Sequence, residues 1–571
     1  MSLSTLQRST PLRAQPQDRA LAAGRRTGLV LLALLPIAAL ALFFGYPVVS
    51  LLGRGLVTSH GLDLGAFGGV FGRSRMQKLL WFTVWQAALS AGLCLLLGIP
   101  GAYLLYRCRF RGQGLLRAFV TVPFVLPTVV VALAFRTLFA TNGPLGGWGW
   151  DGSLAAILAA QVFLNYAVVV RTVGASWSVL DNRPVQAARS LGAGPLRAFL
   201  TITVPALGPA IAGAFVMVFL FCATSFGIML IMGGTRYNTL ETEIYRQTEE
   251  ILDLRTAAVL SIAQILLVTL VLVLAGWLRR RTEATWRLAG RAEAPRRPSG
   301  AGGLVALVAT ALVAIAFAAP MLVMVLRSLQ TPNGWGLDNY RSLATLGEDN
   351  LMLVPVTSAL GNSLRAASIA AVLAVLVGLA LTIVLTRRPS RRSARRLLGA
   401  VDAAMMLPLG VSAVTVGFGF LIALDSPPLD LRSSPLLVPI AQALVALPLV
   451  VRMLLPVLRS ADDRLRQVAS SLGAAPVRVW LSVDLPIMSR ALAGATAFAF
   501  AVALGEFGAT SFLVLPQTPT LPVVIARLIS RPGAANTATA LAAATVLALL
   551  CTAVVLAVDA LAGAKSRIGG F

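Results

Sequence analysis

The chain has 571 residues, of which 57% are hydrophobic and only 12% are charged, and its mean hydropathy is +0.83. A soluble protein of this length carries about twice that charged fraction, so the composition excludes an ordinary soluble globular protein. The net charge of +26 comes mostly from arginines in loops between apolar segments, which indicates a membrane-bound chain without a nucleic-acid partner.

Twelve apolar segments recur along the chain, each near or above the roughly 20 residues that a helix needs to cross a bilayer. The polar residues 1–26 precede them and are expected to form a disordered cytoplasmic tail. We predict an all-α integral membrane protein with about twelve transmembrane helices, six in each half. The segments lie near residues 28–53, 78–106, 116–140, 154–179, 205–233, 256–278, 301–327, 363–386, 397–424, 435–459, 487–515 and 537–562.

An internal repeat relates the two halves. Residues 190–197 read Ser-Leu-Gly-Ala-Gly-Pro-Leu-Arg and residues 471–478 read Ser-Leu-Gly-Ala-Ala-Pro-Val-Arg, so the copies lie 281 positions apart. The same offset relates Phe226-Gly227 to Phe507-Gly508. We therefore expect two homologous transmembrane repeats with pseudo-twofold symmetry, residues 27–280 and 301–571, joined by a basic cytoplasmic linker at 281–300.

The arginines indicate which loops face the cytoplasm. They cluster at residues 107–117, 279–297 and 387–396, and the positive-inside rule places these loops in the cytoplasm. The connection after the fifth segment instead carries Glu241, Glu243, Glu249, Glu250 and Asp253. We expect both termini and both copies of the repeated loop to be cytoplasmic.

The repeated loop has the pattern of a short helix–turn–helix. Gly192 and Gly473 follow a polar helical stretch at a position where a residue without Cβ readily takes the left-handed conformation. Pro195 and Pro476 suit the first turn of a second helix, which we expect to end at Pro205 and Pro486. Small side chains before the turn let another surface approach closely. They belong to Gln186-Ala187-Ala188 and Gln467-Val468-Ala469.

The same loop resembles the cytoplasmic signature Glu-Ala-Ala-x3-Gly-x9-Ile-x-Leu-Pro of permease subunits of binding-protein-dependent ABC importers. The first copy reads Gln186-Ala187-Ala188-x3-Gly192-x9-Ile202-x-Val204-Pro205. The second reads Gln467-Val468-Ala469-x3-Gly473-x9-Val483-x-Leu485-Pro486. Glutamine replaces the family's glutamate in both copies, so docking would depend on shape and neutral hydrogen bonds rather than on a salt bridge.

This resemblance implies a transport subunit in the cell membrane. Its repeated loops would couple to two copies of an ATP-binding cassette subunit in the cytoplasm, and an extracytoplasmic binding protein would deliver a small solute. Chains with two fused halves resemble the thiamine and ferric iron importers and some phosphonate importers. The stretch Trp85-Gln86-Ala87-Ala88-Leu89-Ser90-Ala91 is most similar to thiamine permeases. We therefore expect thiamine or a thiamine phosphate as the solute, with ferric iron or phosphonate as the alternative.

The sequence offers no catalytic or cofactor site. It has no Gly-x4-Gly-Lys-Ser/Thr loop to hold ATP phosphates, so we expect no ATPase site of its own and no enzymatic activity. The four cysteines are far apart in the sequence, and His60 is the single histidine, so there is no second histidine to share a metal ion with it. We expect neither a metal site nor a bound cofactor.

Glu506 is the strongest candidate for the translocation path, because a charge inside a span is costly and needs a reason. It lies in Leu504-Gly505-Glu506-Phe507-Gly508, and its counterpart by the 281 offset is Ser225. Together they would suit a cationic solute, and the neighbouring glycines would allow a break in the span. The alternatives are a position near a span end or a structural pairing with Arg171 or Arg452.

Two further interpretations stay open. The segment Gly233–Glu241 resembles an outer gate and binding-protein docking segment, whereas the acids from Glu241 to Asp253 equally fit a solvated helix face. A proton- or sodium-coupled secondary transporter can also have twelve spans in two halves. Such a carrier should show several intramembrane acids or histidines, and this chain has few.

Overall fold

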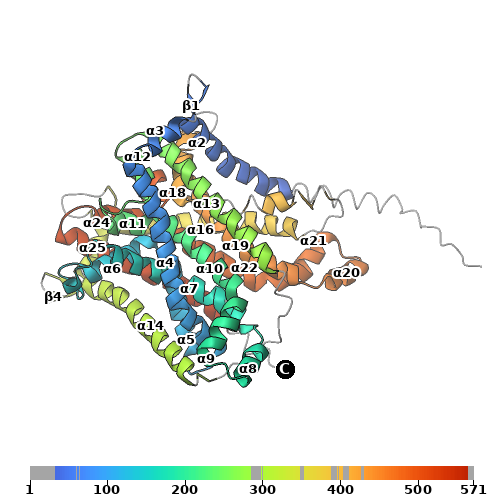
Figure 1. Ribbon diagram of the computed structural model, residues 1–571. Coiled ribbons are helices and arrows are strands. Elements are labelled where there is room, and N and C mark those ends of the chain that lie inside the picture. Colours follow the sequence, from blue (N-terminus) through green and yellow to red (C-terminus); the bar gives the residue numbers. More distant parts are fainter. Residues whose placement is uncertain are drawn as a thin grey trace, which may run out of the picture.

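The computed structural model describes residues 32–563 apart from 59–60, 64, 284–296, 299, 333, 347–352, 387–391, 393–394, 397, 403–404, 406–410 and 426–429. The expected tail at 1–26 and most of the expected linker lie outside the described residues. Most of the described chain is helical (Figure 1).

The first half consists of a series of helices and one small hairpin. The helices are α2 (Tyr46–Leu56), α3 (Gly65–Phe71), α4 (Ser74–Arg107), α5 (Gln113–Thr121), α6 (Thr128–Phe139), α7 (Leu154–Ser178), α8 (Arg183–Ser190), α9 (Pro195–Ala198), α10 (Val204–Ala223), α11 (Phe226–Met232), α12 (Leu240–Glu249) and α13 (Leu254–Glu283). The hairpin pairs β1 (Val57–Thr58) antiparallel with β2 (Gly61–Leu62).

The second half repeats this order. Its described helices are α14 (Gly300–Ser328), α15 (Asp338–Arg341), α16 (Val356–Leu385), α18 (Ala413–Ala423), α19 (Leu437–Ser460), α20 (Asp463–Ser471), α21 (Pro476–Val479), α22 (Leu485–Leu504), α23 (Thr510–Leu513), α24 (Leu521–Ile529) and α25 (Ala534–Gly563). An antiparallel pair of β3 (Gln330–Thr331) and β4 (Gly334–Trp335) again follows the first span of the half.

The described chain has ten helices that are long and apolar enough to cross a membrane, or eleven if one bent pair counts as a span. The sequence predicted about twelve. Ten of the expected segments are found as such helices. The third is the bent pair, in which the axes of Gln113–Val125 and Thr128–Phe139 meet at 104°. Pro127 stands at the bend as the N-cap of α6. Proline has no N–H to donate, and the residue before a proline disfavours the helical conformation, so one continuous helix cannot pass through this point. The ninth is described only in part and contains the 11-residue α18.

Each half is built on three mutually packed helices, α4, α7 and α10 in the first and α16, α19 and α22 in the second. A glycine allows close approach between two of these helices in both halves. A Cβ at Gly98 would lie 2.7 Å from Val169 Cγ1, and a Cβ at Gly378 would lie 2.8 Å from Val450 Cγ1. Because Val169 and Val450 are repeat counterparts, the duplication seen in the sequence is also present in the packing.

The first span of each half packs against the other half. Helix α2 of the first half packs against α18, and α14 of the second half packs against α4 and α6. Helix α25 of the second half also packs against α6. The two halves therefore form one continuous hydrophobic core rather than two separate bundles.

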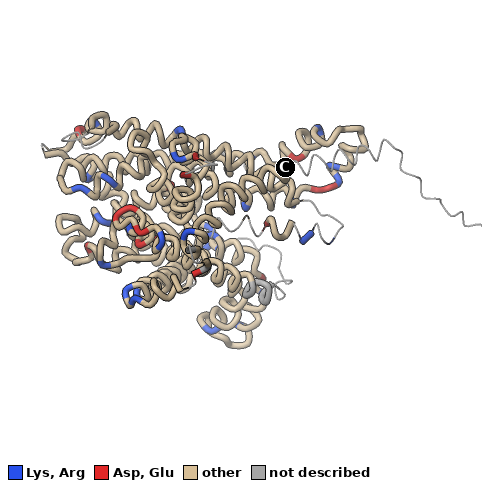
Figure 2. Tube along the Cα trace, turned by 90° about the horizontal axis from the view of Figure 1, so that it is seen from above, with Lys and Arg blue, Asp and Glu red and all other residues tan. Residues whose placement is uncertain are grey.

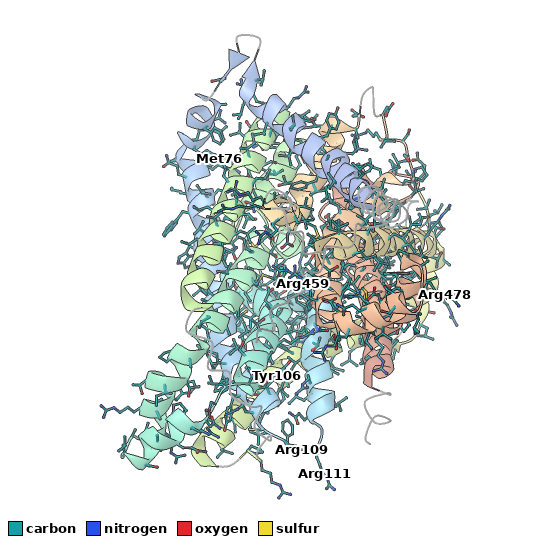
Figure 3. The ribbon with its side chains drawn as sticks, turned by 90° about the vertical axis from the view of Figure 1, so that its right-hand side faces the viewer. Met76, Tyr106, Arg109, Arg111, Arg459 and Arg478 are labelled. Atoms are coloured by element: carbon teal, nitrogen blue, oxygen red, sulfur yellow. The ribbon has the colours of Figure 1, made fainter. Side chains whose placement is uncertain are left out.

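Charged residues are few along the helices and gather at their ends (Figure 2). In Figure 3, Arg109 and Arg111 lie at the bottom of the molecule, below Tyr106 at the end of α4, and Met76 lies near the top, at the start of the same helix. The arginine-rich loop after α4 is thus at the opposite end of the bundle from β1 and α12 (Figure 1).

Candidate functional site

The repeated loop forms two matching elbows. We define the first elbow as α8 with α9 and the second elbow as α20 with α21. In Figure 1 they lie at the bottom and the right of the bundle, while α12, α24 and the hairpins lie at its top and left. Neither elbow helix α8 nor α20 contains a buried residue.

Equivalent hydrogen bonds hold both elbows. The Asp181 carboxylate accepts from Arg183 N–H and the Asp462 carboxylate from Arg464 N–H, each at 2.9 Å. At the turn, Gly192 N–H donates to Arg189 O and Gly473 N–H donates to Ser470 O, each at 3.0 Å. Because each pair is related by the 281 offset, the repeat preserves the local geometry as well as the residues.

The turn glycines have the predicted left-handed conformation. Gly192 has a φ of 88° and Gly473 has a φ of 81°. Residues that have a Cβ atom rarely adopt this backbone conformation. A Cβ at either position would meet open space. The constraint on these residues is therefore the backbone conformation and not the packing around them.

The elbows present apolar side chains to the exterior. Leu191 is 88% exposed and its counterpart Leu472 is 82% exposed. Leu196 with Leu200, and Val477 with Leu481, are also exposed at equivalent places. The predicted docking residues lie on the same elbows. Gln186, Ala187, Gln467 and Val468 are exposed, and Ala188 and Ala469 are partly exposed. Exposed apolar groups repeated in this way indicate a surface that a partner covers.

The second helix of each elbow does not end at Pro205 or Pro486, contrary to the sequence prediction. Helices α9 and α10 are joined by a π-helical turn at Phe199–Thr203, and α21 and α22 by one at Trp480–Asp484. Each proline lies at the second position of the α-helix after that turn. The wider π turn explains how the helix passes the proline, whose ring would clash with the carbonyl of an ordinary preceding turn. Each elbow is thus continuous with a 29-residue span.

An ion pair braces the second elbow. Arg466 Nε donates to Asp484 Oδ1 at 2.8 Å and Arg466 Nη1 donates to Asp463 Oδ1 at 2.5 Å. Burial lowers the pKa of Arg466, but the two carboxylates outweigh it and hold that pKa above its usual value. The counterparts of Arg466 and Asp484 in the first elbow are Val185 and Thr203, so this brace belongs to the second half alone.

Glu506 and Ser225 lie at equivalent breaks between two helices. Ser225 separates α10 from α11, and Glu506 lies between α22 and α23. Glu506 Oε1 accepts from Ala509 N–H at 2.7 Å and Oε2 accepts from Thr510 N–H at 3.0 Å. Both oxygens of this buried carboxylate thus cap the start of α23.

Glycines and phenylalanines follow each break. A Cβ at Gly227 would lie 2.4 Å from Thr128 Oγ1, and one at Gly508 would lie 2.9 Å from Ala413 Cβ, so both breaks press against the start of a short helix, α6 or α18. The rings of Phe226 and Phe507 stack with centroids 5.2 Å apart. The two breaks therefore meet through this stacked pair.

An aromatic seal surrounds that contact. We use this name for Phe226, Phe507, Tyr245 and Phe512, whose rings join the two halves. The Tyr245 centroid lies 5.3 Å from that of Phe226 and 5.5 Å from that of Phe512. Such ring pairs stabilise a contact beyond the area that they bury.

A polar contact between the halves lies beside the aromatic seal. Glu241, which is fully buried at the start of α12, accepts a hydrogen bond from Ser412, the N-cap of α18. Its other oxygen accepts from Gln264 Nε2 at 3.1 Å. Sequence analysis does not predict this contact, because it leaves open whether the acids from Glu241 to Asp253 form a solvated helix face. The structure divides them, since Glu241 and Glu243 are buried whereas Glu249 and Glu250 are exposed.

The described residues include no group of three or more histidine, cysteine or acidic side chains that could hold a metal ion. All four cysteines are free and buried. Cys94 lies in α4 and Cys108 directly follows the end of that helix, while Cys222 lies in α10 and Cys551 in α25.

Similarity to known proteins identifies the kind of molecule. Residues 94–284 match the family described as binding-protein-dependent transport system inner membrane component. The thiamine transport system permease protein of Brucella abortus is 29% identical over 95% of this chain and 98% of its own length. Over nearly its whole length, this chain is similar to permease subunits of binding-protein-dependent transport systems. Its apolar helices are those of a multi-pass inner-membrane protein.

Two further similarities cover less of the chain. The thiamine transport system permease protein of Escherichia coli is 26% identical over 86% of this chain and 90% of its own length. A solved chain of a bacterial ABC transporter involved in the import of the acidic polysaccharide alginate is 17% identical, and the match covers 46% of this chain and 99% of that chain, with a TM-score of 0.40.

Proposed function

We propose that this permease imports thiamine or a thiamine phosphate that an extracytoplasmic binding protein delivers. The proposal rests on the relatives named as thiamine transport system permeases, which this chain matches over nearly its whole length. In this proposal the chain supplies the membrane path, and separate subunits hydrolyse ATP, because it contains no phosphate-binding loop of the Gly-x4-Gly-Lys-Ser/Thr type.

The two elbows serve in this proposal as the contacts for two copies of an ATP-binding subunit. Three features support that role: the exposed apolar side chains, the matching left-handed glycines, and the unbroken helix that leads from each elbow into a span. A rigid helix that passes from the contact surface into the bundle can transmit a displacement to the break near its other end. Gln186, Gly192 and Pro205 belong to the first contact, and Gln467, Gly473 and Pro486 to the second.

In this proposal Ser225 and Glu506 lie beside the path, at the place where the two halves meet. Each immediately precedes a phenylalanine of the aromatic seal. A solute that moves between the halves must separate Phe226 from Phe507. In this proposal Glu506 shapes the path by capping the start of α23.

The orientation and domain boundaries complete the proposal. The arginine-rich ends and both termini face the cytoplasm, and the repeats comprise residues 27–280 and 301–571 with the linker at 281–300 between them. The positive-inside rule supports this orientation. A protease-accessibility assay on sealed vesicles with epitope tags at both termini tests it, and cleavage from the outer side would contradict it.

Reconstitution tests the transport proposal. Proteoliposomes should contain the permease and its ATP-binding subunit, with the purified binding protein added outside and ATP inside. We expect labelled thiamine to enter only when ATP, the ATP-binding subunit and the binding protein are all present. Uptake of ferric citrate and not of thiamine under these conditions would show that the transported solute is iron. Thiamine uptake driven by an ion gradient, with the permease alone, would identify a secondary transporter.

A further inference from the structure

The π turn between each elbow and its span is the place where the two could bend relative to one another. In the second half this turn is Trp480–Asp484, and it belongs to the continuous helix Pro476–Leu504, which ends just before Glu506. Helices kink at prolines and at π turns, and Pro486 follows this turn closely. A displacement of the second elbow would therefore be lost as bending unless another contact holds the turn.

Arg466 holds the turn of the second half against two other segments. Its Nε donates to Oδ1 of Asp484, the last residue of the turn and the N-cap of α22, at 2.8 Å. Its Nη1 donates to Asp463 Oδ1 in the first turn of α20 at 2.5 Å, and its Nη2 donates to Leu458 O near the end of α19 at 3.4 Å. One planar guanidinium, with donors in fixed directions, thus joins α19, the elbow helix α20 and the start of α22.

The pair of Arg466 and Asp484 is largely shielded from water. Their side chains are 26% and 12% exposed, whereas the side chain of Asp463 is 76% exposed. Hydrogen bonds are stronger where water is partly excluded, and a shielded charge that loses its partner is costly. The Arg466–Asp484 contact is therefore the main part of the brace, and removal of Arg466 would leave the Asp484 carboxylate without its cation.

The first half holds the equivalent turn by different chemistry. Its π turn is Phe199–Thr203, and the ring of Phe199 stacks on that of Trp177 near the end of α7, with centroids 5.9 Å apart. The ring of Tyr103 in α4 lies 5.4 Å from the same tryptophan. Trp177 and Leu458 are repeat counterparts, so both halves fix the π turn to the same place at the end of the preceding span. What the halves share is the fixed turn and not a particular interaction.

We propose that Arg466 is a positioning residue for coupling, which fixes the second elbow to the start of α22 so that movement of the ATP-binding subunit reaches the break at Glu506. The inference rests on the proposed function, in which the elbows contact that subunit. Arg466 acts in this role through the angle between α20 and α22 rather than by touching the solute. The first elbow uses its aromatic contact instead, so two identical ATP-binding subunits act on the halves through joints of different chemistry.

A double-mutant cycle in the assembled importer tests this role. Arg466→Met, Asp484→Asn and the double variant are reconstituted with the ATP-binding subunit and the binding protein, and the number of ATP molecules hydrolysed per solute imported is measured. Each single variant should raise this number by about fivefold, because hydrogen bonds between charged groups are the strongest that hold the turn. The double variant should be no worse than either single variant, because all three lose the same interaction. Arg466→Lys keeps the charge but loses the planar guanidinium and should give an intermediate value.

Arg459→Met is the matched control. Arg459 is an exposed arginine in the last turn of α19, outside both elbows, and it forms no ion pair within the described chain. We expect its ratio of ATP to solute to equal that of the wild type. An equal rise in Arg459→Met and Arg466→Met would overturn the proposal, because the loss of any cation near this end of α19 would then suffice.

The other possible results lead to distinct conclusions. An unchanged ratio in both Arg466→Met and Asp484→Asn overturns the proposal, while ATP-dependent uptake by the wild type still supports the proposed function. Effects that multiply in the double variant also overturn it, since the two residues would then act independently. Loss of the ATP-binding subunit on co-purification of Arg466→Met would assign Arg466 to the contact surface and contradict a positioning role. If the wild type imports solute without ATP, the proposed function itself fails.

Discussion

At the scale of single residues, the structure gives Glu506 a role that its charge alone did not suggest. A carboxylate within an apolar segment indicated a cationic solute, but both of its oxygens accept backbone N–H groups at the start of α23. The repeat counterpart Ser225 makes no side-chain cap at the start of α11. The two halves thus break their spans at the same place and support the break differently.

This difference leads to a prediction for Glu506→Gln. The amide keeps one acceptor oxygen but directs an N–H₂ group at the second backbone N–H, so the cap is weakened by about 1 kcal/mol. We expect a lower midpoint of thermal unfolding in detergent, and a loss of uptake of similar size for thiamine and for a neutral analogue. Ser511→Ala is the control, since Ser511 bonds only within its own turn. A loss confined to the cationic solute would instead show direct recognition of charge.

At the scale of elements, each elbow depends on one left-handed residue. The φ values of Gly192 and Gly473 strain any β-branched side chain even though space is free around them. Because the second elbow helix continues into a span, a change in the turn alters the angle between the exposed α8 or α20 and the bundle. The turn therefore sets the position of the surface that we assign to the ATP-binding subunit.

We expect Gly192→Val to uncouple ATP hydrolysis from uptake without preventing membrane insertion. Asparagine tolerates the left-handed region better than other residues with a side chain, so Gly192→Asn should retain more coupled uptake than Gly192→Val. Ala193→Val, one position further along, adds the same bulk outside the strained turn and should have little effect. The measurement is the number of ATP molecules hydrolysed per solute imported. Equal ratios in Gly192→Val and the wild type would contradict the docking role.

The elements also show what sequence could and could not predict. Gly192, Gly473, Pro195 and Pro476 were placed correctly because their constraints are local to a single turn. Pro205 was misread as a helix end, because the π turn that accommodates it leaves no separate mark in the sequence. Glu241 could not be assigned from sequence, since its partner Ser412 is 171 residues away. Contacts between the halves depend on the fold of the whole chain.

At the scale of the whole molecule, the two halves are in contact beside α12, at the end of the bundle that we propose faces outward. The aromatic seal and the Glu241–Ser412 contact both join the first half to the second. Opening an outward path requires both to separate. The hydrogen-bonded contact is buried, so its loss without a replacement partner costs about 1–3 kcal/mol, which biases the equilibrium toward closure.

Removing the Ser412 hydroxyl should shift this balance. Ser412→Ala leaves Glu241 with Gln264 as its remaining partner in the described chain, so we expect easier separation of the halves and a higher rate of ATP hydrolysis without the binding protein. Ser261→Ala is the matched control, because Ser261 is equally buried but bonds only within its own helix. An unchanged basal rate in Ser412→Ala, with the complex intact, would show that the contact does not resist opening.

The closed state should also respond to pH through Glu241. Burial raises the pKa of Glu241 to about 8 from 4.5, although the hydrogen bond from Ser412 lowers it. When the halves separate and water reaches the carboxyl, its pKa returns toward 4.5. The closed state therefore holds a proton that the open state releases, so rising pH between about 4.5 and 8 favours opening, with no further change above that range. The rate of ATP hydrolysis by the ATP-binding subunit also depends on pH. Dividing the wild-type rate by the rate of the Glu241→Gln variant at each pH cancels this dependence. We expect the ratio of the wild-type basal rate to the Glu241→Gln basal rate to rise across this window. A constant ratio would exclude Glu241 as the titrating group.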